Sequence, residues 1–322
     1  MTAFITRRTL GMLVVLFSIS VLVFLIFFAT PGVDPARRLA GRNPDPQTIA
    51  QIKHQFGLDR PLPVRYALMM KHMFISRDLV SYSTQTKVIP QLIEAAPVTL
   101  SLVFGAALIW VVVSILVGLA AAVFRGTVID PLLMILALIG ISMPVFWLGE
   151  VANLVTQSRF HDTFLFRWVP PLGYTPLTEH PIGWFQQMII PWLVLSVLYI
   201  GFYARVLRGN LIETQNEDFV RTARSKGLSE RRVLLRHTLR TSMIVFVSLF
   251  ALDFAALVGG GALLTEVVFG LPGVGYLTYQ SLQGLDLPVI MATVIYGAFF
   301  ITLASALVDV VYAVLDPRIR PA

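Results

Sequence analysis

Long runs of uncharged, apolar residues limit the folds that this sequence can adopt. The first run, from Leu10 to about Thr30, contains no charged residue. A bilayer core about 30 Å thick is crossed by roughly 20 mostly apolar residues in a helix, which pairs its own backbone groups where water is absent. Hydrophobic residues make up 56% of the chain and charged residues only 13%, against about 25% charged residues in a typical soluble domain. The chain is therefore predicted to be an integral membrane protein.

Five further runs bring the predicted number of transmembrane helices to six. They lie within 97–124, at 131–155, near 182–204, at about 241–264 and at about 287–315. Pro191 is expected to kink the fourth span, because proline has no backbone N–H to donate. The predicted fold class is all-α, a polytopic membrane protein whose even number of spans places both termini on one side.

The distribution of Lys and Arg predicts which side that is. Basic residues near the span ends mark the cytoplasmic side of a membrane protein, so both termini are predicted to be cytoplasmic. The residues that share this side are Arg7, Arg8, Arg125, the connection 205–240, Arg318 and Arg320.

Three regions are predicted along the chain. Residues 1–31 form an N-terminal anchor helix, because their apolar run exceeds the 7–15 residues of a signal peptide and no small-residue cleavage site follows. Residues 32–96 are basic but about 60 residues long, a length that is translocated largely regardless of charge, and they are predicted to form an external cap that includes a helix at 47–56. Residues 97–322 form a five-helix core with a cytoplasmic coupling loop at 209–240.

The sequence lacks the residues that several kinds of chemistry require. The chain has no cysteine, no HExxH pair and no GxxxxGK phosphate loop, so we predict no metal site, no catalytic residue and no bound ATP. The net charge of +7 is interpreted as cytoplasmic anchoring charge rather than as a nucleic-acid surface. We predict that the chain is not itself an enzyme.

The most highly charged stretch, EDFVRTARSKGLSERRVLLRH, lies between the fourth and fifth spans. Residues 216–226 predict a short helix in which Phe219, Val220 and Ala223 can form an apolar stripe. The positions expected on its other faces are Glu217, Arg221 and Arg224.

A turn and a second helix are predicted to follow. Gly227 is suited to the left-handed conformation that ends a helix. Ser229 can cap a second helix at 230–239 that leads into the fifth span. The pattern alone leaves two interpretations open: a basic helix that binds anionic lipid, and a docking element for a cytoplasmic partner.

The same stretch closely resembles the cytoplasmic loop of the dipeptide and oligopeptide ATP-binding-cassette importer permeases, of the subunit type with a long first external loop. In the general motif of that loop a Glu-Ala-Ala triplet precedes a glycine. The resemblance implies that this helix docks on an ATP-hydrolysing subunit. The docking residues that it implies are Glu217, Asp218, Phe219, Arg221, Thr222, Ala223, Arg224, Lys226, Gly227 and Ser229, with Arg221, Thr222 and Ala223 in place of the triplet.

Other stretches resemble the same family in the same order along essentially the whole chain. They are RRTLGMLVVLFSISVLVFLIFFATPG, FGLDRPLPVRY, ISMPVFWLG, TEVVFGLPGVGYL and LVDVVYAVLDPRIR. The resemblance implies a type I importer permease fold, in the cell membrane of a prokaryote.

The resemblance also implies partners and a mechanism. The partners are a second homologous permease, two ATP-binding subunits that hold ATP and magnesium, an extracytoplasmic solute-binding protein and membrane lipid, but no nucleic acid. Transport would proceed by alternating access, with di- or oligopeptides as cargo. Nickel chelates, glutathione and oligosaccharides are alternative cargoes for the same permease type, and a secondary transporter is the alternative class, although it would not need the docking loop.

Two further sets of residues are candidates for contact with cargo or for gating. Glu150 and Asp253 are acids within predicted spans, where a central charge costs about 2.5–3.5 kcal/mol on insertion scales, so they are expected to face a cavity or the bundle interior. Asp253 is predicted either to line the translocation path or to be a buried acid bonded to a neighbouring span. The candidates for an external gate loop, which the resemblance implies, are Glu266, Pro272, Gly273 and Gly275.

Overall fold

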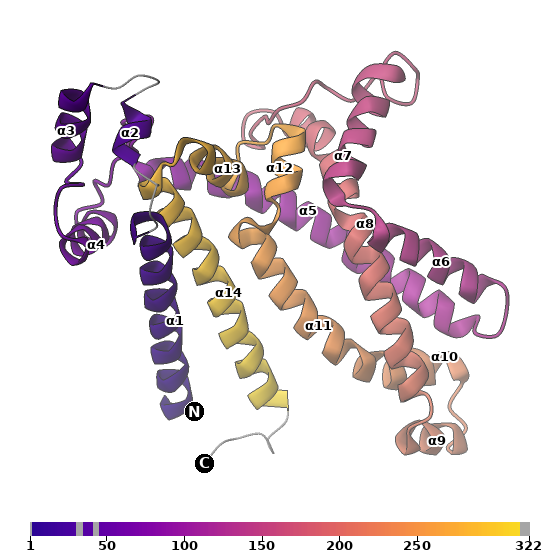
Figure 1. Ribbon diagram of the computed structural model, residues 1–322. Helices are drawn as coiled ribbons and strands as arrows, with labels where there is room; N and C mark the ends of the chain where they lie inside the picture. The colour runs from indigo at the N-terminus through magenta and orange to yellow at the C-terminus, as the bar shows by residue number, and fades with distance from the viewer. Residues whose placement is uncertain (1, 30–34, 41–44, 316–322) are drawn as a thin grey trace. The chain divides into compact units, whose positions relative to one another are not determined.

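The computed structural model describes residues 2–29, 35–40 and 45–315, and these residues are mostly helical (Figure 1). Within those ranges no strand forms, and an isolated antiparallel bridge joins Val80 to Lys87. Five helices are long and apolar enough to cross a membrane, and a bent pair of helices makes a sixth if it is counted as one span. The predicted all-α, multi-span class is confirmed.

The five unbroken spans coincide with five of the predicted apolar runs. The fifth span is a continuous helix from Glu230 to Gly261, so the predicted second basic helix does lead directly into it. These spans are formed by α1 (Thr2–Ala29), α5 (Val88–Val123), α8 (Pro181–Thr214), the series α10 (Glu230–Arg232), η3 (Val233–Thr238), α11 (Leu239–Ala256) and η4 (Leu257–Gly261), and α14 (Leu287–Leu315).

The prediction of the third span as a single helix is wrong. It is divided into α6 (Ile129–Ser142) and α7 (Val145–Asn153), the second continuing as η2 (Leu154–Arg159), and the two parts meet at 92°. The break falls at Met143, whose backbone is extended at φ −86° and ψ 123°. Pro144 follows, and its ring disfavours the helical conformation in the residue before it.

The fourth span remains one helix through its internal proline. Pro191 is buried inside α8, which continues without a break from Pro181 to Thr214. By contrast, the fifth span ends where Gly260 adopts φ +109°, a conformation that glycine accepts without strain.

The chain divides into two compact units. The first contains α1, the first part of α5, α14 and the residues from α1 to α5, which include α2 (Pro35–Leu39), α3 (Pro46–Gln55), α4 (Leu62–Met70) and η1 (Lys71–Ile75). It also contains η4, most of α12 (Leu263–Phe269) and α13 (Val274–Gly284). The helix predicted at 47–56 is α3.

Within this first unit, a buried carboxylate connects the segment before α5 to the start of α14 by hydrogen bonds. Asp286 is 3% exposed and accepts hydrogen bonds from the Ser81 hydroxyl, from the backbone N–H of Tyr82 at 3.0 Å and from that of Ser83 at 3.1 Å. Hydrophobic packing adds to this connection, because Phe24 of α1 and Val289 of α14 lie in one buried cluster with Met73.

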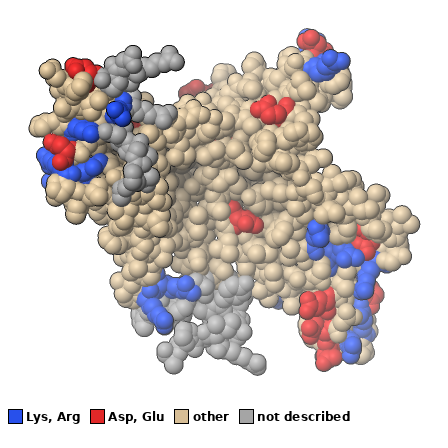
Figure 2. All heavy atoms as spheres, viewed as in Figure 1, with Lys and Arg blue, Asp and Glu red and all other residues tan. Residues whose placement is uncertain are grey.

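The second unit comprises Ser101–Phe254 and Val268–Gly270. In it α6 packs closely on α8, because Gly201 has no side chain: a Cβ there would lie 2.3 Å from the Ala137 carbonyl oxygen. The indole of Trp110 stacks on the Tyr199 ring at 4.5 Å between centroids. Figure 2 shows charged side chains gathered around α10 and α9 (Asp218–Ser225) and, in the first unit, around α3 and α4, with few along the long helices.

Close packing within the first unit predicts that one glycine there does not tolerate a larger side chain. A Cβ on Gly297 of α14 would lie 2.3 Å from the carbonyl oxygen of Gly259. We expect Gly297→Ala to destabilise the protein by about 1–3 kcal/mol, the usual cost of overpacking, and to lower its melting temperature in detergent. Gly11→Ala is the matched control in α1, since a Cβ there meets nothing within 4 Å. Equal melting temperatures for the two variants would contradict this packing.

Candidate functional site

The candidate site is the short helix α9 together with the turn and helix that follow it, all within the second unit. Glu217 precedes α9 in an extended conformation, at φ −69° and ψ 148°. On one face of the helix Val220 and Ala223, three residues apart, are buried, as expected for neighbours on a helix surface. They pack with Val233 of η3 and with Leu228. This small core attaches α9 to the base of the fifth span.

The apolar stripe is narrower than predicted. Phe219 is 43% exposed and lies outside the buried cluster. Because successive residues of a helix are separated by about 100°, the ring of Phe219 cannot share the face of both Val220 and Ala223. An aromatic ring is thereby left on the outer surface of α9.

A specific turn ends α9. Gly227 adopts φ +78°, its N–H donates to the Arg224 carbonyl at 2.9 Å, and the N–H of Leu228 donates to the Ala223 carbonyl at 3.4 Å. These two bonds and the left-handed glycine form a Schellman motif, including the apolar contact between Leu228 and Ala223 that accompanies it. A Cβ on Gly227 would meet nothing within 4 Å, so only the backbone conformation demands glycine there.

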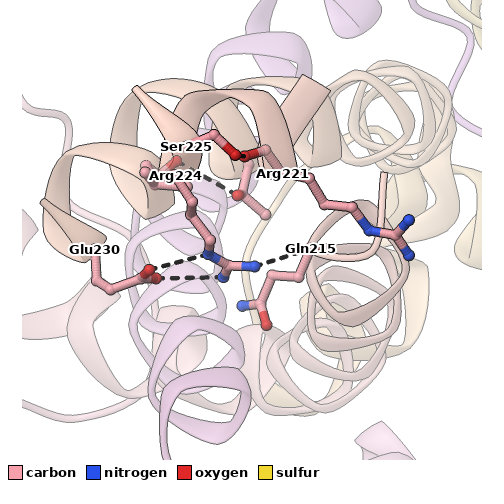
Figure 3. Close-up of polar contacts among 7 residues, drawn as sticks. Gln215, Arg221, Arg224, Ser225 and Glu230 are labelled. Atoms are coloured by element: carbon pink, nitrogen blue, oxygen red, sulfur yellow. Dashed lines mark hydrogen bonds and ion pairs between the residues drawn. The ribbon is translucent and has the colours of Figure 1, made fainter. Parts of the chain in front are cut away.

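Arg224 connects the three segments around this turn (Figure 3). Its Nε donates to Glu230 Oε1 at 2.9 Å and its Nη2 to Oε2 at 3.2 Å, while Nη1 lies 3.5 Å from the carbonyl oxygen of Gln215. Gln215 follows the last residue of α8, and Glu230 is the first residue of α10. A single side chain therefore links the end of the fourth span, α9 and the start of the fifth.

Ser229 has a smaller role than predicted. It occupies the position before α10, but its hydroxyl makes no capping hydrogen bond. The backbone N–H of Val233 donates to the Ser229 carbonyl at 3.0 Å instead.

The outer surface of α9 is polar around Phe219. The Thr222 and Ser225 hydroxyls donate to carbonyls of their own helix, and Arg221 lies 3.5 Å from Asp218, with both side chains more than two-thirds exposed. An ion pair this exposed contributes little to stability. The exposed residues available to a partner are Asp218, Phe219, Arg221, Thr222, Ser225 and Lys226.

Glu150 and Asp253 are not joined by a hydrogen bond in the part of the chain that the structure describes. Glu150 is exposed on α7. Asp253 of α11 is partly exposed, and its Oδ2 accepts a hydrogen bond of 2.6 Å from the Tyr203 hydroxyl on α8.

The predicted gate residues lie in the first unit around one buried carboxylate. Glu266 is fully buried, and its oxygens accept from the Thr99 hydroxyl at 2.7 Å and from the N–H of Tyr276 at 2.8 Å. Gly273 allows this approach, since a Cβ there would lie within 2.6 Å of both carboxylate oxygens. Burial raises the pKa of Glu266, while the hydrogen bonds act in the opposite direction.

The other two gate residues have different surroundings. A Cβ on Gly275 would lie 2.6 Å from Leu263 Cα, so this glycine is required for close packing of α13 on α12. Pro272 is exposed in the turn between them.

Sequence reasoning missed a second ion pair near the site. Arg208 of α8 donates from Nε and Nη2 to the two oxygens of Asp130, both at 2.6 Å. This bidentate pair joins the start of α6 to the last part of α8, ten residues before α9 begins. The signal available in the sequence was an acid and a base at the ends of two predicted spans, but sequence distance does not show that those ends meet.

The described residues contain no group of three or more His, Asp or Glu side chains that could hold a metal ion.

Comparison with known proteins gives consistent matches along the chain. Residues 114–321 match the family described as binding-protein-dependent transport system inner membrane component, and residues 1–103 match the N-terminal region of such membrane components. A protein of Brucella abortus (strain 2308) named as a peptide transport system permease is 34% identical over 320 residues, which cover 99% of both chains. A glutathione transport system permease of Salmonella paratyphi A is 36% identical over 329 residues, again covering 99% of both chains.

A variant of Arg224 tests the attachment of α9. We expect Arg224→Ala to raise the rate of amide hydrogen exchange in residues 218–226 about five-fold, because hydrogen bonds to Glu230 and Gln215 are lost at a cost of about 1 kcal/mol. Arg221→Ala is the control, since its exposed pair with Asp218 contributes little. If both variants exchange at the wild-type rate, Arg224 does not hold the helix in place.

Proposed function

Because this chain belongs to the family of binding-protein-dependent transport system inner membrane components, we propose that it conducts peptides into the cell as a permease subunit of an ATP-binding-cassette importer. Peptide cargo is supported by relatives named as peptide transport permeases that match over nearly the whole chain. The multi-span helical fold agrees with a place in the bacterial inner membrane.

The observation that carries the mechanism is the attachment of α9 at both ends. Arg224 connects it to the end of α8 and to the start of α10, and the cluster around Val220 packs it on η3. We propose that a force applied to α9 reaches the fourth and fifth spans through these contacts. We propose that α9 docks on an ATP-binding subunit through the exposed ring of Phe219 and its polar neighbours.

The proposed assembly follows from this role. A transporter of this family works with ATP-binding subunits and a binding protein. We propose two ATP-binding subunits, which hold ATP and magnesium, and a second homologous permease beside this chain. Both termini and α9 lie on the cytoplasmic side in this proposal, consistent with the basic residues around α10.

We propose that the segment around α13 serves as the external gate facing the binding protein. Glu266 accepts hydrogen bonds from Thr99 of α5 and from the backbone at the start of α13, so the gate loop is fixed to the second span. Pro272 is exposed at its turn. Movement of α5 would then be transmitted to the gate through one carboxylate. Glu150 remains a candidate for the translocation path because it is an exposed acid within a span segment.

Glutathione is a second candidate cargo. One relative that covers 99% of this chain is named as a glutathione transport permease, and glutathione is itself a small peptide. Uptake of both cargoes by the reconstituted complex would separate them.

Gly227 provides the test of coupling. We expect Gly227→Val to reduce uptake of peptide per ATP hydrolysed at least five-fold, because a β-branched residue at positive φ is strained by roughly 1–2 kcal/mol and would displace α9. Gly227→Asn is the matched control, since asparagine tolerates the left-handed conformation. The measurements are ATP hydrolysis and peptide uptake by the same proteoliposomes. Unchanged coupling in the valine variant would contradict the role proposed for α9.

A further inference from the structure

Asp253 differs from the other buried or partly buried acids in how its charge is balanced. Both oxygens of Asp130 are paired with Arg208. Both oxygens of Asp286 and of Glu266 accept hydrogen bonds. Asp253 accepts one hydrogen bond, from the neutral hydroxyl of Tyr203. Among the described residues no Lys, Arg or His forms an ion pair with it.

The uncompensated carboxylate lies well inside a span. Asp253 is eight residues before the end of the helix Glu230–Gly261, or about 12 Å along the helix axis. A charge at such depth costs about 2.5–3.5 kcal/mol on insertion scales unless it faces a partner or a water-filled cavity. The side chain is partly exposed, so a partner can reach it.

The neighbouring residues hold this carboxylate in position. Tyr203 is fully buried, and its ring packs edge-on against Phe246 at 4.8 Å between centroids and lies 6.1 Å from Trp110. A ring packed in this way fixes its hydroxyl, which in turn fixes Asp253 Oδ2 at 2.6 Å. The other oxygen, Oδ1, accepts no hydrogen bond from the described residues and remains available.

Two aromatic residues lie close to Asp253 along its helix. Phe250 lies one turn before Asp253 on the same helix and is partly exposed, and its ring is 5.5 Å from Trp110. Phe254 follows Asp253 directly, with its ring 5.6 Å from that of Phe250. The faces of such rings attract ammonium groups, which adds to the attraction of the carboxylate.

We propose that Asp253, oriented by Tyr203, binds the ammonium group at the amino terminus of a peptide during its passage through the permease. A peptide amino terminus has a pKa of about 7.7–8.0 and is mostly protonated at pH 7. Asp253 is the binding residue and Tyr203 the positioning residue. This inference rests on the proposed function and specifies the feature of the cargo that the span recognises.

The first test removes the charge and keeps the shape. Asp253→Asn retains an oxygen that can accept from Tyr203, so a merely structural residue would tolerate it. We expect this variant to lower the initial rate of uptake of a free dipeptide by the whole reconstituted transporter about ten-fold, as for loss of one member of a close charge pair. Asp253→Glu keeps the charge and should stay within about three-fold of wild type. Ser248→Ala is the control on the same helix, since its hydroxyl bonds only to Ile244 of that helix.

The second test concerns the amino terminus itself. The preference for a free dipeptide over its N-acetylated analogue should fall at least five-fold in Asp253→Asn, because the charge that recognises the ammonium group is gone. Tyr203→Phe should reduce the same preference by a smaller factor. An unchanged preference, or wild-type uptake by Asp253→Asn, would overturn the inference.

A third measurement distinguishes loss of the negative charge from misfolding of the variant. Because the chain has no cysteine, Asp253→Cys provides one reactive site in this subunit. A methanethiosulfonate reagent that adds a sulfonate should restore uptake several-fold, and one that adds an ammonium group should not. Equal effects of the two reagents would overturn the inference. Failure of the proposed function would give a different result from failure of this inference, because the wild-type transporter would then take up no peptide.

Discussion

The structure depends on the lack of hydrogen-bonding water inside a bilayer. Backbone groups there must pair within their own helix, and buried carboxylates in the described part of this chain have specific partners. Arg208 pairs with Asp130 through both carboxylate oxygens, and buried Glu266 accepts from Thr99 and from the start of α13. Each pair joins segments that lie far apart in the sequence. Asp253, with one neutral donor, departs from this pattern, and we infer a role in binding for that reason.

Coupling requires stiffness outside the membrane as well. An isolated helix as short as α9 would be marginal in water, so its conformation comes from its attachments. The Schellman turn at Gly227, the small core around Val220 and the bonds of Arg224 hold it against the bases of α8 and α10. The apolar stripe of α9 is already buried, and the surface that remains exposed presents Phe219 among polar residues.

Local signals in the sequence predicted much of this fold. Uncharged runs located the spans, and Gly227 located the turn after α9, because both features depend on neighbouring residues alone. The break at Pro144 was not predicted, since the sequence does not reveal whether a helix continues through a proline, as it does at Pro191, or ends before it. The exposure of Phe219 and the partners of Arg224 and Asp130 also required the structure, because they depend on which distant segments meet.

Coupling in the assembled transporter depends, in this proposal, on contact between α9 and an ATP-binding subunit. The chain has no cysteine, so Thr222→Cys places a single thiol on the exposed face of α9, and Thr48→Cys places one on the exposed face of α3 as a matched control. Treatment of the intact complex with a short bismaleimide should link position 222 to an ATP-binding subunit, provided that a cysteine lies opposite it, and position 48 to none. Absence of that product when cysteines are placed across the exposed surface of the ATP-binding subunit would show that α9 does not dock there.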